Sequence, residues 1–391
     1  MERLTGQIQP YAWGSTTAIP ELLGTEPTGD PQAELWLGAH PKAPSTYGDQ
    51  PLDAAITADP ESLLGKASVD EFGPRLPYLM KVLAAAQPLS LQAHPSRDEA
   101  EAGFAREEKA GVAIDAPERL YKDDWPKPEA LCALGDVEAL CGFRAPAETY
   151  ALFEGLGVES ALDLVAPLQQ GEADALAEVF GGVLQLSEDQ ALIVTDVVEA
   201  ARALVDGEDD LAAFARTAVE LDKFYPGDPG VLGGLLMNRM AFGRNQALFL
   251  PAGNLHAYLH GTGVEIMANS DNVLRGGLTP KHIDVDELLR LLDFTPGVPD
   301  LVEAVAEEPG VWRYRTPAPE FALWRLDLDG QEVPLPGSGH GRIALVVEGS
   351  AQLSGPATLE LARGESAFVT ALDDVRVTGT GTVFVAGPGV G

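Results

Sequence analysis

The stretches QAHP, at residues 92–95, and PAGNLH, at residues 251–256, decide the fold that this sequence predicts. Side chains alternate between the two faces of a β-strand, so Gln92 and His94 point the same way. Gly253 permits a tight turn in the second stretch, after which His256 begins a strand of its own. Pairing of the two strands would place His256 opposite Gln92 and His94. The sequence therefore predicts a metal site on a β-barrel.

Length and charge exclude several classes of protein. A chain of 391 residues is longer than a single core usually fills, so two or three domains are expected. The net charge of −34, from 26 basic and 60 acidic residues, repels nucleic acid and anionic membranes, and neither is expected as a partner. No run of about eighteen apolar residues is present, so no membrane-spanning helix is expected.

The cysteine content and the first residues predict a cytoplasmic protein. Cys132 and Cys141 are too few for a disulfide framework, and two core thiols fit a reducing compartment. The segment from Met1 to Gly14 lacks the charged-then-apolar layout of a signal peptide.

Hydrophobic periodicity divides the chain into three regions. Residues 1–144 and 225–320 contain short apolar runs typical of β-strands, as at residues 76–83 and 246–250. Between them, residues 145–224 show apolar positions at steps of three and four, for example Val194, Val198 and Ala201, which predict an acidic helical insertion. Asp284 is the expected N-cap of one more short helix, which ends near Leu292. Residues 321–391 alternate again and predict a second, smaller β domain.

A fourth metal ligand is available in the segment KPE at residues 127–129. Zinc sites use imidazole, thiolate and carboxylate ligands, and catalytic zinc sites leave one position open. Glu129 offers a hard oxygen on a segment stiffened by prolines, beside the candidates Gln92, His94 and His256. A hydrogen-bonded core histidine is an equally good interpretation of His94 alone. Only the combination of the four favours a metal.

Charged residues also stand among apolar ones between Glu265 and Lys281. Buried charge is unfavourable unless it is paired or used, so this segment is a candidate for function. The alternative is a structural ion pair, such as Glu265 with Arg275. For Lys81 and Lys127, the alternative to a functional role is that both are solvated surface cations. If they lie near Arg275, the scarce cations of this acidic chain converge on one pocket for an anionic substrate.

Seven blocks of sequence, in this order, resemble the type I mannose-6-phosphate isomerases, a zinc-dependent family of the cupin class. The blocks lie at residues 9–14, 33–41, 76–83, 90–95, 127–129, 251–259 and 265–281. The resemblance implies a mainly β fold with an α insertion: a cupin-type jelly-roll barrel from residues 1–144 and 225–320, a helical domain at 145–224, and a C-terminal cupin-like β domain at 321–391. Two positions depart from the family. Trp125-Pro126 replaces the usual Asn-His, and Ser96-Arg97 replaces the usual Asp-Lys.

The resemblance also implies a function, the interconversion of mannose 6-phosphate and fructose 6-phosphate through an enediol. It implies zinc as the cofactor, with Gln92, His94, Glu129 and His256 as its ligands, and Arg275 as an active-site residue. The phosphate is expected at Lys81, Lys127 and Ser90, and Trp13 is expected to bind the substrate. The residue that removes the proton stays open among Glu265, Asp271, Lys281 and His40.

Two other functions are compatible with part of this sequence. A non-catalytic cupin that binds a sugar would keep the metal ligands and could lose the acid–base residues, yet Glu265, Asp271, Arg275 and Lys281 are all present. A cupin oxygenase using iron is compatible with histidine and carboxylate ligands, but Gln92 is an unusual ligand for it. The expected partner is a small phosphorylated sugar, and the protein is expected to be a monomer.

Overall fold

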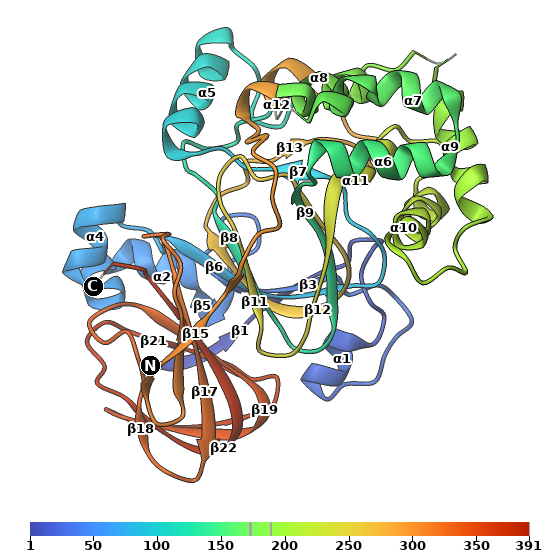
Figure 1. Cartoon of the computed structure of the whole chain (residues 1–391). Helices are drawn as coiled ribbons and strands as arrows, with labels where there is room; N and C mark the ends of the chain where they lie inside the picture. The colour runs from blue at the N-terminus through green and yellow to red at the C-terminus, as the bar shows by residue number, and fades with distance from the viewer. Residues whose placement is uncertain (172–173, 188–189, 391) are drawn as a thin grey trace.

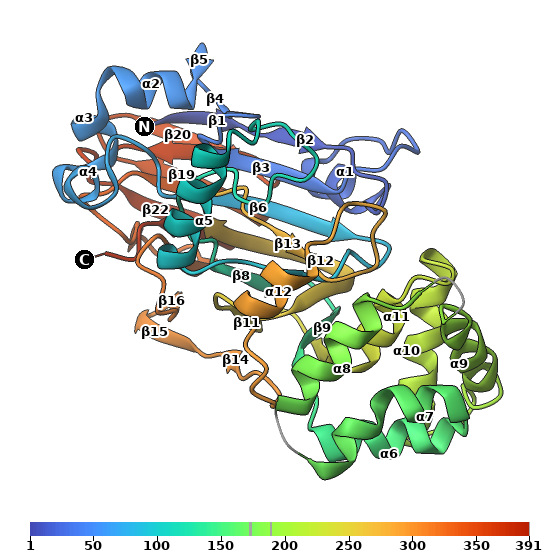
Figure 2. The same ribbon diagram turned by 90° about the horizontal axis from the view of Figure 1, so that it is seen from above.

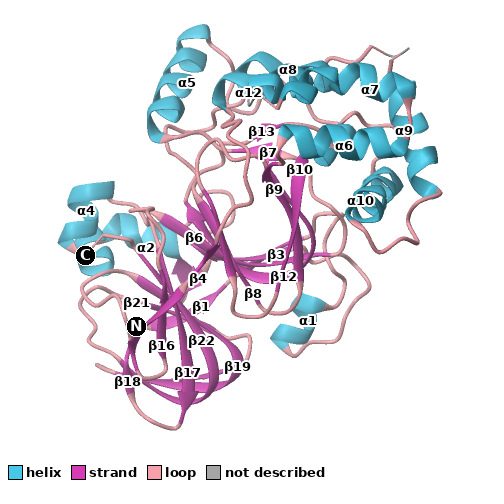
Figure 3. Cartoon of the chain, viewed as in Figure 1, coloured by secondary structure: helices cyan, strands magenta, loops and turns pink. Residues whose placement is uncertain are grey.

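The computed structural model describes residues 1–171, 174–187 and 190–390 (Figure 1). It contains two large antiparallel sheets with helices on their outer sides, and most of the helices gather at one end of the molecule (Figures 1 and 3). The predicted class, mainly β with a helical insertion, is confirmed. None of the described helices combines the length and the apolar character that a membrane crossing requires.

The first sheet is built around one long strand, β12 (His256–Ala268). Its path runs β14 (Leu301–Val302), β11 (Ala247–Leu250), β8 (Glu129–Ala133), β12, β6 (Tyr78–Ala85), β3 (Glu34–Gly38) and β2 (Gln7–Gln9). Four further strands pair beside this path: β7 (Gln92–Ala93), β9 (Val137–Phe143), β10 (Met237–Phe242) and β13 (Leu274–Arg275).

Strand β12 changes partners halfway along its length. Its first residues, from His256, pair with β7 and β9, and the part from Gly261 onward pairs with β6 and β8. Gly261 has φ 121°, and a Cβ there would lie 2.6 Å from the carbonyl oxygen of Asp136, so glycine is required at the bend. The strand continues through this glycine to Ala268.

The second sheet joins the two ends of the chain. Its path runs β15 (Ala304–Glu308), β16 (Val311–Tyr314), β17 (Ala322–Asp329), β22 (Arg376–Gly387), β19 (Arg342–Ser354), β21 (Ser366–Val369), β1 (Glu2–Thr5), β4 (Thr46–Tyr47) and β5 (Gln50–Pro51), with β18 (Val333–Pro334) on β22 and β20 (Thr358–Ala362) on β19. Arg3 pairs with Ala367, so the N-terminal strand lies within the C-terminal sheet. The boundaries 1–144, 145–224, 225–320 and 321–391 stay a prediction, and this pairing crosses the first and the last of these regions.

Helices fill the segment between β9 and β10 (Figure 2). They are α6 (Pro146–Leu156), α7 (Glu159–Val165), a 3₁₀ turn (Ala166–Gln170), α8 (Asp174–Leu184), α9 (Leu192–Arg202), α10 (Asp210–Phe224) and α11 (Gly230–Leu235). The periodic residues Val194, Val198 and Ala201 are buried, as their spacing predicts. Helix α11 extends the helical segment beyond the predicted end at residue 224.

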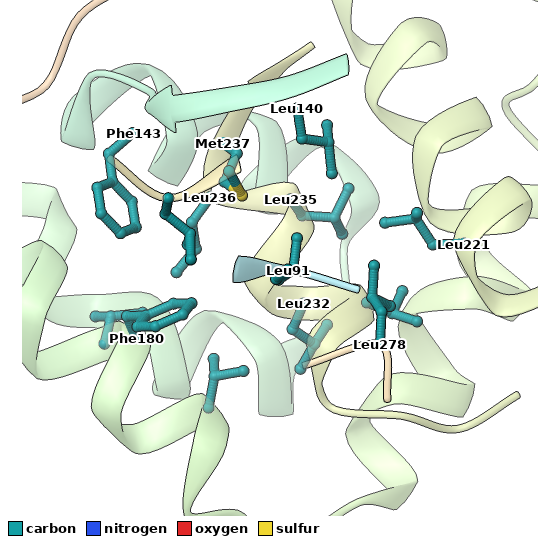
Figure 4. Close-up of a cluster of buried hydrophobic side chains, with 14 of the residues drawn as sticks. Leu91, Leu140, Phe143, Phe180, Leu221, Leu232, Leu235, Leu236, Met237 and Leu278 are labelled. Carbon is teal, nitrogen blue, oxygen red and sulfur yellow. The ribbon is translucent and has the colours of Figure 1, made fainter. Parts of the chain in front are cut away.

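A shared hydrophobic core fixes these helices to the barrel (Figure 4). Leu91 and Leu140 come from the barrel side, while Leu221 and Leu232 come from α10 and α11, and all four are fully or almost fully buried. Leu91 directly precedes β7, the strand that carries Gln92. The helical segment therefore supports the part of the barrel where the metal site was predicted.

The remaining helices flank the two sheets. They are α1 (Ala18–Leu23), α2 (Leu52–Ala58), α3 (Pro60–Leu64), α4 (Lys66–Phe72), α5 (Arg97–Ala110) and α12 (Val285–Leu291). Ser96 and Glu99 form a capping box at the start of α5, and the Asp284 carboxylate accepts a hydrogen bond from the Glu287 N–H at the start of α12. Cys132 and Cys141 are buried free thiols, as expected.

Candidate metal centre

Three buried side chains from three distant parts of the sequence converge in the barrel. His94 Nε2 lies 3.3 Å from one Glu129 oxygen, and His256 Nε2 lies 3.5 Å from the other. One ligand atom from each residue can be chosen so that all lie within 4.8 Å of one another. Cross-strand register explains this meeting. Gln92 pairs with His256 between β7 and β12, and Glu129 pairs with Met267 farther along β12.

Each imidazole is oriented for metal binding by a backbone carbonyl. His94 Nδ1 donates to the carbonyl oxygen of Asn272 at 2.7 Å, and His256 Nδ1 donates to that of Asn254 at 3.0 Å. These bonds place the proton on Nδ1 and leave Nε2 with a free lone pair. Both Nε2 atoms are buried and lack a hydrogen-bond partner among the described residues. Two orphaned imidazole nitrogens directed at one carboxylate fit a divalent metal.

The protonation states favour metal binding. Burial lowers the pKa of His94 to about 4, aided by the charge of Lys127, so the imidazole is neutral at pH 7. Burial alone would raise the pKa of Glu129, but Lys127 and His94 hold it well below the usual range. The Lys127 ammonium lies 3.0 Å from a Glu129 oxygen. Glu129 is therefore an anionic ligand beside the neutral imidazole of His94.

Gln92 is the half-buried cross-strand partner of both His256 and Arg275. It lines the same cavity as Glu129. Its role as a metal ligand stays a prediction.

A second buried charge cluster lies on the neighbouring strands. The Lys81 ammonium is 3.1 Å from Glu265 and 3.5 Å from Glu34, whose other oxygen accepts a hydrogen bond from Trp36 Nε1 at 2.6 Å. Burial raises the pKa of Glu265 to about 7, against the lowering effect of Lys81. Burial opposes the charged form of Lys81, but Glu34 and Glu265 nevertheless raise its pKa.

Two alternatives from the sequence are wrong here. Lys81 and Lys127 are 6% and 8% exposed, so they are not solvated surface cations. Glu265 pairs with Lys81 and not with Arg275, because the register of β6 and β12 places Lys81 directly opposite it.

A cavity of about 790 Å³ opens beside both clusters. It collects side chains from the loops and strands of the barrel, and those predicted for the substrate or for catalysis all line it: Trp13, Lys81, Ser90, Lys127, Glu265, Asp271, Arg275 and Lys281. His40, His282 and Tyr258 line it as well. The volume is in the range of small-molecule sites.

The candidates for proton transfer differ sharply in their surroundings. Asp271 lies 2.9 Å from the Lys42 ammonium and 3.5 Å from His40 Nε2. Although burial opposes it, these contacts hold the pKa of Asp271 far below its usual value. Lys281 has its pKa lowered chiefly by the nearby charge of Arg275. Within the part of the chain that the structure describes, neither Arg275 nor Lys281 forms an ion pair.

Sequence reasoning missed how the residues around Asn272 hold the site together. Asn272 is fully buried. Its amide donates to the carbonyl oxygens of Asp123 and Trp125 at 2.8 Å, and its Oδ1 accepts from the Lys122 N–H at 2.7 Å. Since its own carbonyl binds His94, Asn272 connects that ligand to the segment before Glu129. No sequence signal separates such an asparagine from one in a turn.

The unusual Trp125 lies in this same segment. It is almost fully buried and packs against two guanidinium groups, with Arg75 3.8 Å and Arg97 5.3 Å from its ring centroid. Arg97 also binds Glu320 at 2.9 Å. Trp125 therefore fixes the segment before Glu129 by packing, where the family usually has polar residues.

Comparison with known proteins agrees with this geometry. Residues 1–146 match the model of the phosphomannose isomerase type I catalytic domain. The mannose-6-phosphate isomerase of Escherichia coli (strain K12) is 39% identical over 97% of this chain and 98% of its own length. The mannose-6-phosphate isomerase of Homo sapiens is 31% identical over 96% of this chain and 94% of its own length.

Solved structures agree over the whole chain. A crystal structure of mannose 6-phosphate isomerase bound with zinc and yttrium superposes with a TM-score of 0.89 at 36% identity, covering 99% of both chains. The apo form from Salmonella typhimurium gives the same TM-score, identity and coverage. The predicted pair of cupin-like β units with a helical insertion is thus confirmed. From its sequence, its fold and its buried histidine–carboxylate group, this chain belongs to the type I mannose-6-phosphate isomerase family.

Proposed function

We propose that this chain interconverts mannose 6-phosphate and fructose 6-phosphate. The observation that carries the proposal is the buried group of His94, Glu129 and His256 beside a cavity rich in cations. The relatives at 31% and 39% identity, which cover nearly the whole chain, bear names for this activity. A sugar phosphate is an anion, and a cationic cavity attracts it in a chain whose net charge is −34.

Zinc is the metal that this donor set fits. His94, Glu129 and His256 would hold it, and Gln92 is the proposed fourth ligand. The bound metal supplies Lewis-acid polarisation of the sugar carbonyl and of the oxygen where negative charge develops. The carbonyl oxygens of Asn272 and Asn254 keep both imidazoles in the tautomer that this requires.

Arg275 and Lys281 are the proposed phosphate-binding residues. Both line the cavity, and they are close enough for Arg275 to lower the pKa of Lys281. Two neighbouring cations without a described carboxylate partner are unfavourable by themselves and complement a phosphate dianion. Lys81 and Lys127, for which the sequence also predicts phosphate binding, form ion pairs with Glu265 and Glu129. They hold the two carboxylates in place, and their contact with the substrate stays a prediction.

Glu265 is the proposed proton carrier between C1 and C2 of the sugar. A pKa of about 7 allows a carboxylate to take and return a proton near neutral pH. Asp271 is a poorer base because Lys42 and His40 stabilise its anion. Ser90 and Trp13 line the same cavity and are proposed to bind the sugar.

The oligomeric state and the cellular location of the protein are part of the proposal. We expect a monomer that acts in the cytoplasm on a small phosphorylated sugar, without nucleic acid or membrane as a partner. The buried free thiols of Cys132 and Cys141 support a reducing compartment.

A coupled assay tests the proposed activity. Isomerisation of mannose 6-phosphate is measured before chelation, after chelation and after zinc is added back, with the metal content determined at each stage. We expect activity to fall and return with zinc. A protein that binds sugar phosphate but neither forms ketose nor exchanges the C2 proton in deuterated water would be a binding protein, and the proposal would be wrong.

A further inference from the structure

A second cavity, of about 730 Å³, lies between the helical segment and the barrel, and none of its lining residues lines the first cavity. Helices α9 and α10 and the loop between them form one wall, and Pro88 and Leu259 lie on the barrel side. The two cavities lie back to back. Pro88 and Leu259 face this one, while their neighbours Ser90 and Tyr258 face the catalytic cavity.

The cations of the helical segment meet in this cavity. Between residues 146 and 238 the sequence has only three basic residues, Arg202, Arg216 and Lys223, among many acidic ones. All three line the cavity, although they belong to two helices. A random scatter of three cations over this segment would leave most of them elsewhere. Their convergence concentrates the positive charge of this acidic segment in one place.

Two of these cations are not neutralised by any described carboxylate. Arg216 donates from Nη1 to the carbonyl oxygens of Val205 and Gly207 at 2.8 Å, which fixes the guanidinium without neutralising it. Lys223 Nζ lies 4.9 Å from the ring centroid of Phe224. Across the described residues 1–171, 174–187 and 190–390, neither cation has a carboxylate within ion-pair distance. Arg202 lies 3.4 Å from Glu199 and 3.6 Å from Asp222, and its pair with Glu199 is weak because the two side chains are 51% and 70% exposed.

The acidic residue of the lining is ion-paired. Glu220 lies 2.7 Å from Arg239 Nη1, a guanidinium that it shares with Glu138, so the repulsion of Glu220 on an anion in the cavity is reduced. The rest of the lining is mostly apolar and includes Val219, Phe224 and Leu259. The site thus combines free positive charge with an apolar wall that carries one aromatic ring.

We propose that this cavity binds a small organic phosphate with an apolar, ring-containing body. Lys223 and Arg202 receive the phosphate together with the pre-positioned Arg216, since charge-assisted hydrogen bonds to phosphate are strong. The ring of the ligand packs on Phe224 and the aliphatic residues beside it. A cavity of this volume holds a ligand of that size.

Calorimetric titration of the full chain with phenyl phosphate tests the site, with inorganic phosphate as the charge-only probe. The first variant combines Lys223→Gln with Arg202→Gln and leaves Arg216, which supports the loop, in place. The matched control combines Arg244→Gln with Arg376→Gln, two half-exposed arginines outside both cavities, so that the net charge changes equally. Arg275→Ala reports on binding at the catalytic cavity.

We expect the wild type to bind phenyl phosphate more tightly than inorganic phosphate, and the first variant to weaken that binding by about tenfold or more. The matched control and Arg275→Ala should retain this binding event. Circular dichroism and thermal unfolding establish that each variant is folded. The proposal is overturned if no saturable binding occurs, if both probes bind equally well, or if only Arg275→Ala abolishes the event. Equal weakening by the matched control also overturns it, because net charge alone would then explain the effect.

Discussion

Replacement of Glu265 by Gln tests the proposed proton carrier most directly. The substitution keeps the shape of a side chain that is 2% exposed and removes its ability to accept a proton. A positioned general base contributes roughly 10²- to 10⁴-fold to the rate, so kcat should fall by a factor in that range. Glu265 is outside the metal-binding group, so the zinc content should not change.

The pH dependence adds a second measurement with a defined sign. Burial raises the pKa of Glu265 to about 7, and a base acts only when deprotonated, so kcat/KM rises with pH through this region. For a pKa of 7, the ionised fraction grows from about one tenth at pH 6 to about nine tenths at pH 8. Zinc stabilises a nearby anion, so in the zinc-loaded protein the rise of kcat/KM with pH is centred at pH 7 or below.

The assay is a coupled isomerase measurement between about pH 5 and pH 9, run on the wild type and the Gln variant at equal zinc content. The phosphate group of the substrate also titrates near pH 6, and its effect appears in both proteins. The limb due to Glu265 appears only in the wild type. A Gln variant that keeps more than about a tenth of the wild-type kcat, or the same pH profile, refutes the role of Glu265.

Three further predictions concern other parts of the molecule. Arg275→Ala should raise the KM for mannose 6-phosphate by about tenfold or more without loss of zinc, and an unchanged KM would remove Arg275 from the phosphate site. Leu232→Ala, in the core between the helical segment and the barrel, should lower the free energy of unfolding in urea by about 2–5 kcal/mol, and a change below about 1 kcal/mol would show that this core is dispensable. Burial raises the pKa of Glu287, but hydrogen bonds from Arg290, Tyr121 and Arg106 lower it from 4.5 to about 2. The ionised Glu287 therefore stabilises the fold fully above pH 4.5, and this stabilisation is lost as the pH falls through about 2. The Tm of the wild type should exceed that of Glu287→Gln by less at about pH 3 than at about pH 5. A Tm difference that stays constant over this range would contradict the prediction.

Local patterns were enough to predict much of the site. The alternation of side chains in a strand put Gln92 and His94 on one face, and the turn at Gly253 put His256 at the start of β12. Helical periodicity identified α9, and the capping pattern at Asp284 identified α12. These features depend on neighbours within a few residues, so they can be derived from sequence alone.

Charge pairing could not be derived in this way. Lys81 and Lys127 were equally compatible with a solvated surface, and Glu265 with a bond to Arg275. Their actual partners follow from strand register, which places Lys81 opposite Glu265, and from burial, which forces each charge to find a partner. Register depends on contacts between segments almost two hundred residues apart.

The sequence by itself determined the fold class, the family and the chemical identity of the metal-binding group, because these reside in short motifs and in the local alternation of apolar residues. Only the tertiary structure decided which charges are neutralised, that the N-terminal strand completes the C-terminal sheet, and that the three cations of the helical segment share a cavity. The physical reason is that burial and long-range pairing are properties of the packed chain. A side chain's neighbours in sequence do not specify what it will face once distant segments come together.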